Sequence, residues 1–231
     1  MKCAIMQPTY LPWAGYFNLI RQADTFVFLD DVQFERRSWQ SRNRILLNGR
    51  EHFLTIPVIK SPRDTPLHEI RICHDGNWME KHLRTLNEAY KKAAHGKEIL
   101  DIIEHVFSAK TYLRLTELTE RITLSIAGAL KIDTEFVQAS KLKCGGTRTD
   151  HLIEISRNLN CETYLSPPGS RDYLGNDGFT RKTSVKLDFQ EFRPAPYQQY
   201  RSDTFVSHLS IVDVIANQGL AYTSRYIAES T

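Results

Sequence analysis

The sequence predicts an α/β fold, with a Rossmann-like, mostly parallel sheet, helices on both faces and a helical insertion. Two observations support this prediction. Short apolar strand patterns alternate with helical periodicity along the 231 residues, and the run at residues 25–29 is apolar on both faces, as in a strand covered on both sides. We expect a single α/β domain over residues 1–231, within which residues 78–130 form a helical insertion or cap.

The amino-terminal segment predicts a strand, a turn, a helix and a second strand. Residues 4–6 form a brief apolar run, and Pro8 and Pro12 then interrupt regular pairing. Residues 13–22 carry apolar side chains at helical spacing, and the strand at residues 25–29 follows.

The centre of the chain predicts two short strands and then a helical region. Strands are expected at residues 53–58 and 69–72. From residue 78 to about 130 the apolar side chains recur at spacings of three and four, and Gly96 and Ser108 divide this region into three helices.

The carboxyl-terminal half returns to alternating strands and helices. Strands are expected at residues 134–137, 161–165 and 185–189, and helices at residues 147–159 and 209–217, the second closed by Gly219. Near the last helix, His208, Ser210 and Asp213 are not expected to form a catalytic triad, because one helix places such side chains for packing and capping. Asp213 is expected to brace a loop.

Two carboxylates, Asp30 and Asp31, fall at the carboxyl end of the strand at residues 25–29. In open α/β sheets, ligands bind beyond the carboxyl ends of the strands, so the first loop and this pair are expected to share one cleft. Asp30 and Asp31 are the candidate catalytic residues, because a carboxylate there could bind Mg²⁺, orient a sugar hydroxyl or act as a general base. The alternative is that one caps a turn and the other pairs with Arg36 or Arg37. Adjacent side chains on a strand point in opposite directions, so one of the two is expected to face the ligand.

The segment after these carboxylates is rich in arginine, which suits a bidentate grip on phosphate or carboxylate. Interleaved aromatic and amide side chains favour a nucleotide or nucleotide sugar as the ligand. The alternative is a solvated face with ion pairs to Glu35 and Glu51. The candidate anion-binding residues are Arg36, Arg37, Trp39, Arg42, Asn43 and Arg44, and Arg50 belongs to the same cluster.

Two loops complete the predicted binding site. In the first, Tyr10 and Trp13 could stack on a base or sugar ring, or could belong to the core, and the Gln7 amide is either a specificity hydrogen bond or a turn stabiliser. The second loop, residues 166–173, offers backbone amides to a phosphate or carboxylate. Its candidate binding residues are Gly169, Ser170, Arg171 and Tyr173.

Composition narrows the class of protein. The net charge of +3, from 30 basic and 27 acidic residues, argues against an extended nucleic-acid partner. The four cysteines lack metal-ligand spacing, which predicts free thiols in a reducing compartment and no structural metal site. There is neither a signal-peptide pattern nor an 18-residue apolar stretch, so we expect a cytoplasmic protein without a membrane span. Apolar side chains of the helical insertion make a homodimer a candidate assembly.

Several motifs in one order resemble the WbqC-like family of bacterial proteins, and the resemblance covers nearly the whole chain. They lie at residues 4–8, 11–12 and 15–17, at 30–34, 37–39 and 42–44, at 163–166 and 173–174, and at 209–213, Asn217 and Gly219. The resemblance implies a role in the assembly of surface polysaccharide, O-antigen, lipopolysaccharide or glycolipid. It also implies that some members transfer an acyl or aminoacyl group to a sugar.

The layout is also similar to that of nucleotidylyltransferases, whose first strand-loop-helix unit receives a nucleotide. Those enzymes use a His-x-Gly-His pair, whereas this chain has no histidine before His52, so adenylyl transfer by that mechanism is not expected. A nucleotide with Mg²⁺ stays a candidate cofactor. We therefore expect a transferase that acts on a small-molecule or sugar substrate, with a nucleotide-linked amino sugar as the candidate acceptor. The alternative is a non-catalytic protein that binds a nucleotide sugar or phosphorylated metabolite.

Overall fold

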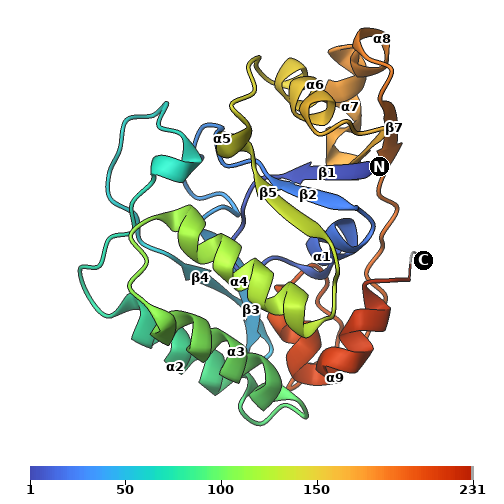
Figure 1. Ribbon diagram of the computed structural model, residues 1–231. Coiled ribbons are helices and arrows are strands. Elements are labelled where there is room, and N and C mark those ends of the chain that lie inside the picture. The colour runs from blue at the N-terminus through green and yellow to red at the C-terminus, as the bar shows by residue number, and fades with distance from the viewer. Residues whose placement is uncertain (230–231) are drawn as a thin grey trace.

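The computed structural model describes residues 1–229, and within them five parallel strands form the main sheet (Figure 1). The strands are β1 (Lys2–Met6), β2 (Thr25–Phe28), β5 (Glu135–Gln138), β6 (Thr163–Ser166) and β7 (Lys186–Phe189). Their order across the sheet is β5-β2-β1-β6-β7, so the direction of strand addition reverses between β1 and β6. That order is the one found in Rossmann-like sheets, and the predicted fold class is confirmed.

The alternation of side chains along each strand supplies both faces of the sheet with apolar groups. Ala4 is paired with Phe26, and both belong to the larger core cluster, which also contains residues of the helices α1 (Ala14–Arg21) and α4 (Leu115–Ala129). Cys3, Ile5 and Val27 face the opposite way, into a second cluster. Helices α6 (Thr149–Asn158), α7 (Arg171–Asn176) and α8 (Phe179–Lys182) cover that side of the sheet.

Three helices lie in the chain between the hairpin that follows β2 and strand β5, and three helices were predicted in this region. They are α2 (Trp78–Tyr90), α3 (Gly96–Ala109) and α4. Helix α3 packs against the carboxyl-terminal helix α9 (Ile211–Tyr226), and α2 packs against the hairpin (Figure 1). The apolar side chains of these helices join the core cluster that covers one face of the sheet. The division of residues 1–231 into one domain stays a prediction.

The strand expected at residues 53–58 is one arm of a hairpin that the sequence analysis did not recognise. Strand β3 (Arg42–Leu47), within the arginine-rich segment, pairs with β4 (Arg50–Thr55). Asn48 and Gly49 form the turn, with φ of 51° and 74°. Two consecutive positive φ angles match the right-handed twist of a hairpin, and Asn-Gly is the sequence that adopts them most readily.

Two other expectations are wrong in detail. Residues 69–72 form no strand. Glu69 ends the short 3-10 helix η1 (Leu67–Glu69), and Arg71 and Ile72 make only isolated bridges, to Arg114 and Val58. The predicted loop at residues 166–173 contains the 3-10 helix η2 (Pro168–Ser170) and the start of α7.

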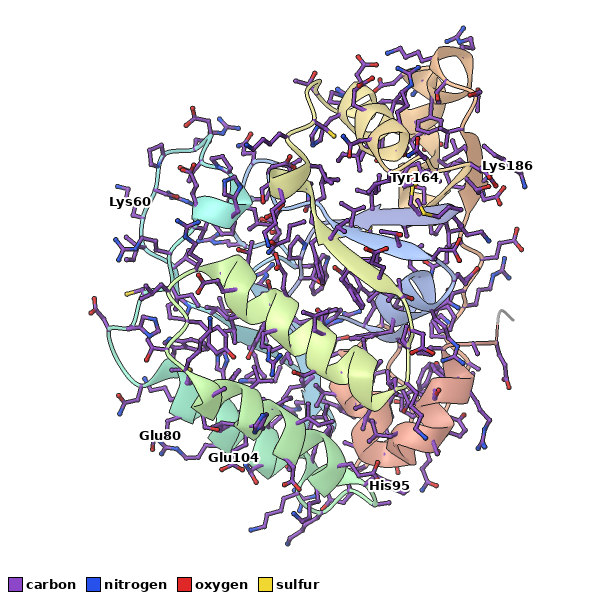
Figure 2. The ribbon with its side chains drawn as sticks, in the orientation of Figure 1. Lys60, Glu80, His95, Glu104, Tyr164 and Lys186 are labelled. Atoms are coloured by element: carbon purple, nitrogen blue, oxygen red, sulfur yellow. The ribbon has the colours of Figure 1, made fainter. Side chains whose placement is uncertain are left out.

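Gly219 ends the first half of the last helix, as predicted, with φ of 80° and ψ of 165°, but a second helical segment that was not predicted follows it to Tyr226. The helix resumes because Glu98 Oε2 accepts a hydrogen bond from Leu220 N at 2.9 Å. His95 lies beside α9 at this break (Figure 2), and its backbone N–H donates to the Ala216 carbonyl at 2.9 Å. A side chain from α3 therefore caps the second half of α9.

Candidate functional site

Two neighbouring cavities lie at the carboxyl end of β1, beside the point where the strand order reverses. Their volumes are about 260 Å³ and about 440 Å³. Met6, Thr9 and Trp39 line both cavities, so we treat them as two lobes of one β1 cleft. This position is the usual ligand site of an open α/β sheet.

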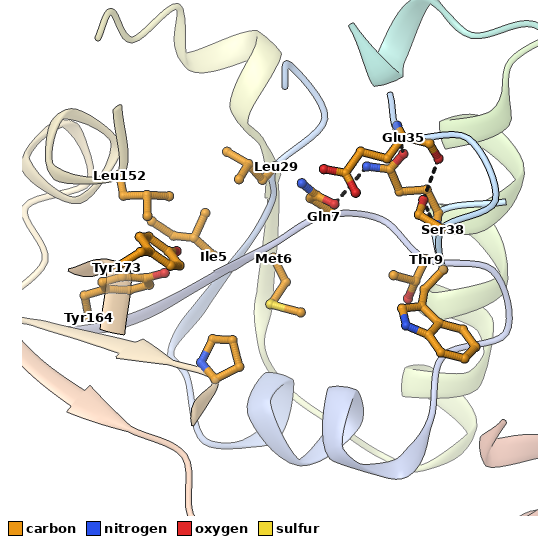
Figure 3. A pocket seen from close by; sticks show the side chains of 13 residues that line it. Ile5, Met6, Gln7, Thr9, Leu29, Glu35, Ser38, Leu152, Tyr164 and Tyr173 are labelled. Carbon is orange, nitrogen blue, oxygen red and sulfur yellow. Dashed lines mark hydrogen bonds between the residues drawn. The ribbon is translucent and has the colours of Figure 1, made fainter. Parts of the chain in front are cut away.

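The smaller lobe, the polar lobe, surrounds the first residue after β1. Gln40 Nε2 donates to Gln7 Oε1 at 2.8 Å, and Gln40 Oε1 accepts from the Glu35 backbone N–H at 2.8 Å (Figure 3). Tyr16 Oη donates to the Gln7 carbonyl at 3.1 Å. These contacts fix the Gln7 amide, and the polar side chains that line the lobe are Gln7, Thr9, Glu35, Ser38, Gln40, Tyr164 and Tyr173.

Glu35 is the carboxylate of the polar lobe. Its side chain is exposed, and it makes no ion pair among residues 1–229. Ser38 donates its hydroxyl to the Glu35 carbonyl at 2.7 Å, so the Glu35 backbone is held at both its N–H and its carbonyl. A carboxylate without an ion pair, on a backbone held in this way, is suited to accept a proton or a hydrogen bond from a bound ligand.

The larger lobe, the aromatic lobe, carries flat side chains and one cation. Trp13 stacks on His208 with ring centroids 4.7 Å apart. Trp39 is 49% exposed, and the Arg44 guanidinium carbon lies 5.9 Å from its ring. Arg44 Nη1 also donates to both carboxylate oxygens of Glu51, at 2.9 and 3.0 Å, which holds the guanidinium at the edge of the lobe.

The hairpin positions the loop between β1 and α1. Asn43 Nδ2 donates to the carbonyls of Tyr10 and Leu11, at 3.0 and 2.8 Å, and Leu11 has a φ of 45°. The ring of Tyr10 is fully buried, and its hydroxyl lies at hydrogen-bond distance from His82 Nδ1, 2.8 Å. Burial lowers the pKa of His82 to about 4, so the imidazole is neutral and can accept this bond. Tyr10 therefore contacts α2 rather than the cleft.

Asp30 and Asp31 bind different partners. Both oxygens of Asp30, which is 1% exposed, are bonded to Ser140 in helix α5 (Ala139–Leu142): Oδ1 to the backbone N–H at 2.8 Å and Oδ2 to the hydroxyl at 2.6 Å. Asp31 lies 3.1 Å from His151 Nε2. Neither aspartate lines a lobe of the β1 cleft, and their catalytic role stays a prediction.

His151, in α6, is the buried partner of Asp31. Its Nδ1 lies 2.9 Å from the Gly145 carbonyl, which requires a proton on that nitrogen. The hydrogen bond to Asp31 raises the pKa of His151, because it stabilises a second proton on Nε2. Leu29 and Leu152, close in the chain to Asp31 and His151, line the polar lobe.

The arginines of the predicted cluster do not converge on one point. Arg36 donates to the Ser61 carbonyl at 3.0 Å, and Arg42 lies 4.8 Å from the Phe53 ring. Arg37 and Arg50 are exposed. Among the described residues of this cluster, Arg44 lines the cleft and the other arginines do not.

The predicted second loop contributes two residues to the cleft. Pro167 and Tyr173 line the polar lobe. Ser170 is buried, with its hydroxyl 2.6 Å from Ser166 Oγ and 2.7 Å from the Pro167 carbonyl, and the Arg171 guanidinium lies 4.1 Å from the Phe189 ring. Gly169 is exposed.

Asp213 braces the carboxyl-terminal segment, as predicted, and does not contact His208. Its carboxylate accepts from Tyr90 Oη at 2.9 Å, Tyr197 Oη at 2.7 Å and Gln199 Nε2 at 2.8 Å. Burial raises its pKa. Tyr90 Oη in turn accepts from the Leu46 backbone N–H at 3.1 Å, so Asp213 connects α9 and α2 to the hairpin that forms one wall of the cleft.

The sequence analysis did not single out several residues that line the cleft. The lining residues that were not predicted to bind ligand include Thr9, Glu35, Ser38, Gln40, Tyr164 and His208. Glu35, Ser38 and Gln40 flank Trp39 in the sequence, and that proximity was the available signal. His208 reaches the cleft through the bridge between Trp13 and Ser210, which no local pattern reveals.

Residues 1–229 contain no group of three or more histidine, cysteine or acidic side chains placed to hold a metal ion. Nor does any helix in that range have the length and apolar character to cross a membrane. A cytoplasmic location, a nucleotide cofactor and a homodimer stay predictions.

Comparison with known proteins gives a family and little chemistry. The model of the WbqC-like protein family matches residues 7–225. Rv1507c of Mycobacterium tuberculosis, described as an uncharacterized protein, is 30% identical over 222 residues, which is 94% of each chain. No solved structure matches this chain.

Proposed function

We propose, from the premise that this chain belongs to the WbqC-like protein family, that it is a transferase of surface polysaccharide or glycolipid precursor assembly. The reaction is transfer of an acyl or aminoacyl group from an activated donor to the amino group of a sugar. A nucleotide-linked amino sugar is the acceptor class that we propose.

The two-lobed form of the β1 cleft carries this proposal. A transfer reaction needs two substrates whose reacting atoms meet, and the lobes meet at Met6, Thr9 and Trp39. The polar lobe offers amide, hydroxyl and carboxylate groups, which suit the hydroxyls and amine of a sugar. The aromatic lobe offers ring faces and a guanidinium, which suit the planar and anionic parts of a nucleotide or coenzyme.

Glu35 is the group that we assign to proton transfer. The sugar amine must lose a proton as its nitrogen attacks the donor carbonyl carbon. The C–N bond forms, the bond from that carbon to the donor's sulfur or oxygen breaks, and the leaving group departs with the electron pair. The Glu35 carboxylate accepts the amine proton, and Gln7, fixed by Gln40, orients the sugar. The predicted role of Asp30 and Asp31 is the rival assignment.

Binding is tested by thermal unfolding with UDP-linked amino sugars and coenzyme A thioesters, because a ligand stabilises the folded state that binds it. Arg44→Ala and Trp39→Ala are expected to remove the stabilisation by the donor. Arg50→Ala is the matched control, since Arg50 lies on the same hairpin and outside the cleft. Equal stabilisation of all four proteins would refute the donor site.

Turnover separates the enzyme from a binding protein. Mass spectrometry of the sugar follows its acylation by the wild type and by Glu35→Gln, Asp30→Asn and Asp31→Asn. We expect Glu35→Gln to bind the acceptor and to lose acylation by a factor of about 100 or more. If Asp31→Asn loses acylation while Glu35→Gln keeps normal turnover, Asp31 rather than Glu35 accepts the proton. Binding without turnover for every donor would favour the non-catalytic alternative.

A further inference from the structure

A carboxylate outside the β1 cleft lacks one of its hydrogen bonds. Glu120, on α4, is 7% exposed. Its Oε2 accepts from Gln138 Nε2 at 2.5 Å, whereas its Oε1 is buried without any hydrogen-bond partner in the part of the chain that the structure describes. An unpaired buried carboxylate oxygen destabilises a fold, so its presence calls for a compensating partner.

Glu120 lines two cavities, which we call together the Glu120 pocket. One, of about 380 Å³, lies between α4 and the end of β5, and its walls are mainly apolar. The other, of about 420 Å³, lies along the first half of α4. Leu124 is shared by both, and the other apolar side chains are Phe28, Phe136, Val137 and Leu142 in the first cavity. Figure 1 shows α4 and β5 side by side at this edge of the sheet.

The charges around Glu120 favour a cation at its free oxygen. Burial raises the pKa of Glu120 to about 7, and repulsion by the Asp30 carboxylate raises it more than attraction to Lys141 lowers it. Glu117 adds to the repulsion. Three cations also line the pocket, Lys110, Arg121 and Lys141, but all three are exposed, whereas Glu120 and the Asp30 carboxylate that repels it are buried.

We propose that the Glu120 pocket binds a primary amine carried on an apolar group, with the ammonium donating a hydrogen bond to Glu120 Oε1. The apolar group packs between Leu124 of α4 and Phe136 of β5. The ammonium supplies the missing hydrogen-bond partner of Glu120. It also offsets the negative charges of Asp30 and Glu117, which a neutral hydroxyl cannot do. This site is separate from the β1 cleft and does not depend on the proposed transferase activity, because none of the residues that line the Glu120 pocket lines either lobe.

Hexylamine is the probe, and hexan-1-ol is the matched ligand that lacks the charge. Titration at pH 8, followed through the methyl resonances of Val137, Leu124 and Leu142, locates binding on the wild-type chain. Glu120→Gln keeps the volume of the side chain and replaces one acceptor oxygen with an amide nitrogen. The affinity for hexylamine is therefore expected to fall by about tenfold or more. Glu135→Gln is the control, since Glu135 begins β5 and is exposed outside the pocket.

The proposal has three expected results: methyl shifts with hexylamine, weaker shifts with hexan-1-ol, and loss of affinity in Glu120→Gln alone. Equal affinity for hexylamine and hexan-1-ol would overturn it, as would unchanged hexylamine affinity in Glu120→Gln. Absence of methyl shifts on the wild-type chain would overturn it without reference to any variant. The thermal unfolding of Glu120→Gln, compared with wild type, confirms that lost affinity is not lost structure.

Discussion

Removing the charge of Glu120 is expected to change how stability depends on pH. The pKa of this carboxyl is raised from 4.5 to about 7 by burial in the folded chain. Between these values the unfolded chain is ionised at this position while the folded chain keeps the proton. The folded state therefore binds more protons, and the free energy of unfolding falls as pH rises through this range.

The size of the effect follows from the same two values. The difference between about 7 and 4.5, at about 1.4 kcal/mol for each pKa unit, corresponds to about 3 kcal/mol. Glu120→Gln has no proton to lose at this position. Relative to wild type, the variant should gain about 3 kcal/mol in the free energy of unfolding between pH 4 and pH 8, with no further gain above pH 8.

Urea denaturation followed by tryptophan fluorescence, at several pH values, measures this difference for wild type and Glu120→Gln. Subtraction cancels the other titrating groups, including His151, because both proteins contain them. Glu135→Gln, at an exposed position, should show a difference close to zero at every pH. If the free energy of unfolding of Glu120→Gln relative to wild type stays constant from pH 4 to pH 8, the reasoning is refuted. If this relative free energy falls as pH rises, the pKa of Glu120 is lowered by folding rather than raised.

Three more outcomes are expected. Asp213→Ala should lower the free energy of unfolding by about 3 kcal/mol or more, measured in urea, because three donors, of which Tyr90 and Gln199 are buried, lose their acceptor. Gly219→Ala should cost about 2 kcal/mol in the same assay, since its φ of 80° is strained for alanine and a Cβ would lie 2.8 Å from His95 Nδ1; an unchanged midpoint would contradict this strain. Asp31→Asn should lower the pKa of His151 in an NMR titration. In wild type the ion pair stabilises the fold below about pH 6.5, and this stabilisation is lost as pH rises through the raised pKa of His151. Asp31→Asn should remove this contribution to the free energy of unfolding.

The fold was predictable where each element has its own local pattern. Strand β2 is apolar on both faces, and the three insertion helices keep their spacing over many residues, so both were placed correctly. Strand β3 was missed because its arginines were interpreted as a ligand site, although Asn48 and Gly49 mark a hairpin. Gly219 was correctly taken as a helix end, but the helical segment after it was not predicted, because its cap comes from Glu98, which is distant in sequence.

The candidate site was predictable in position and only partly in composition. The rule for strand ends located the loop after β1, and Gln7, Trp13 and Trp39 do line the cleft. The rule does not say which way a side chain points. Tyr10 follows the same strand, yet it is turned into the core by its bond to His82.

The central position of β1 has a consequence for how the chain folds. Strand β1 is synthesised before the strands that pair with it. Strand β2 follows closely, but the other neighbour of β1 is β6, at Thr163–Ser166. Contacts between residues so far apart in sequence form slowly, because a long loop must close first. One edge of β1 therefore stays open until residues 163–166 have been synthesised, and the nascent chain is exposed to edge-to-edge aggregation during that interval. We expect a chaperone that shields this strand to raise the yield of folded protein more than it raises the final stability.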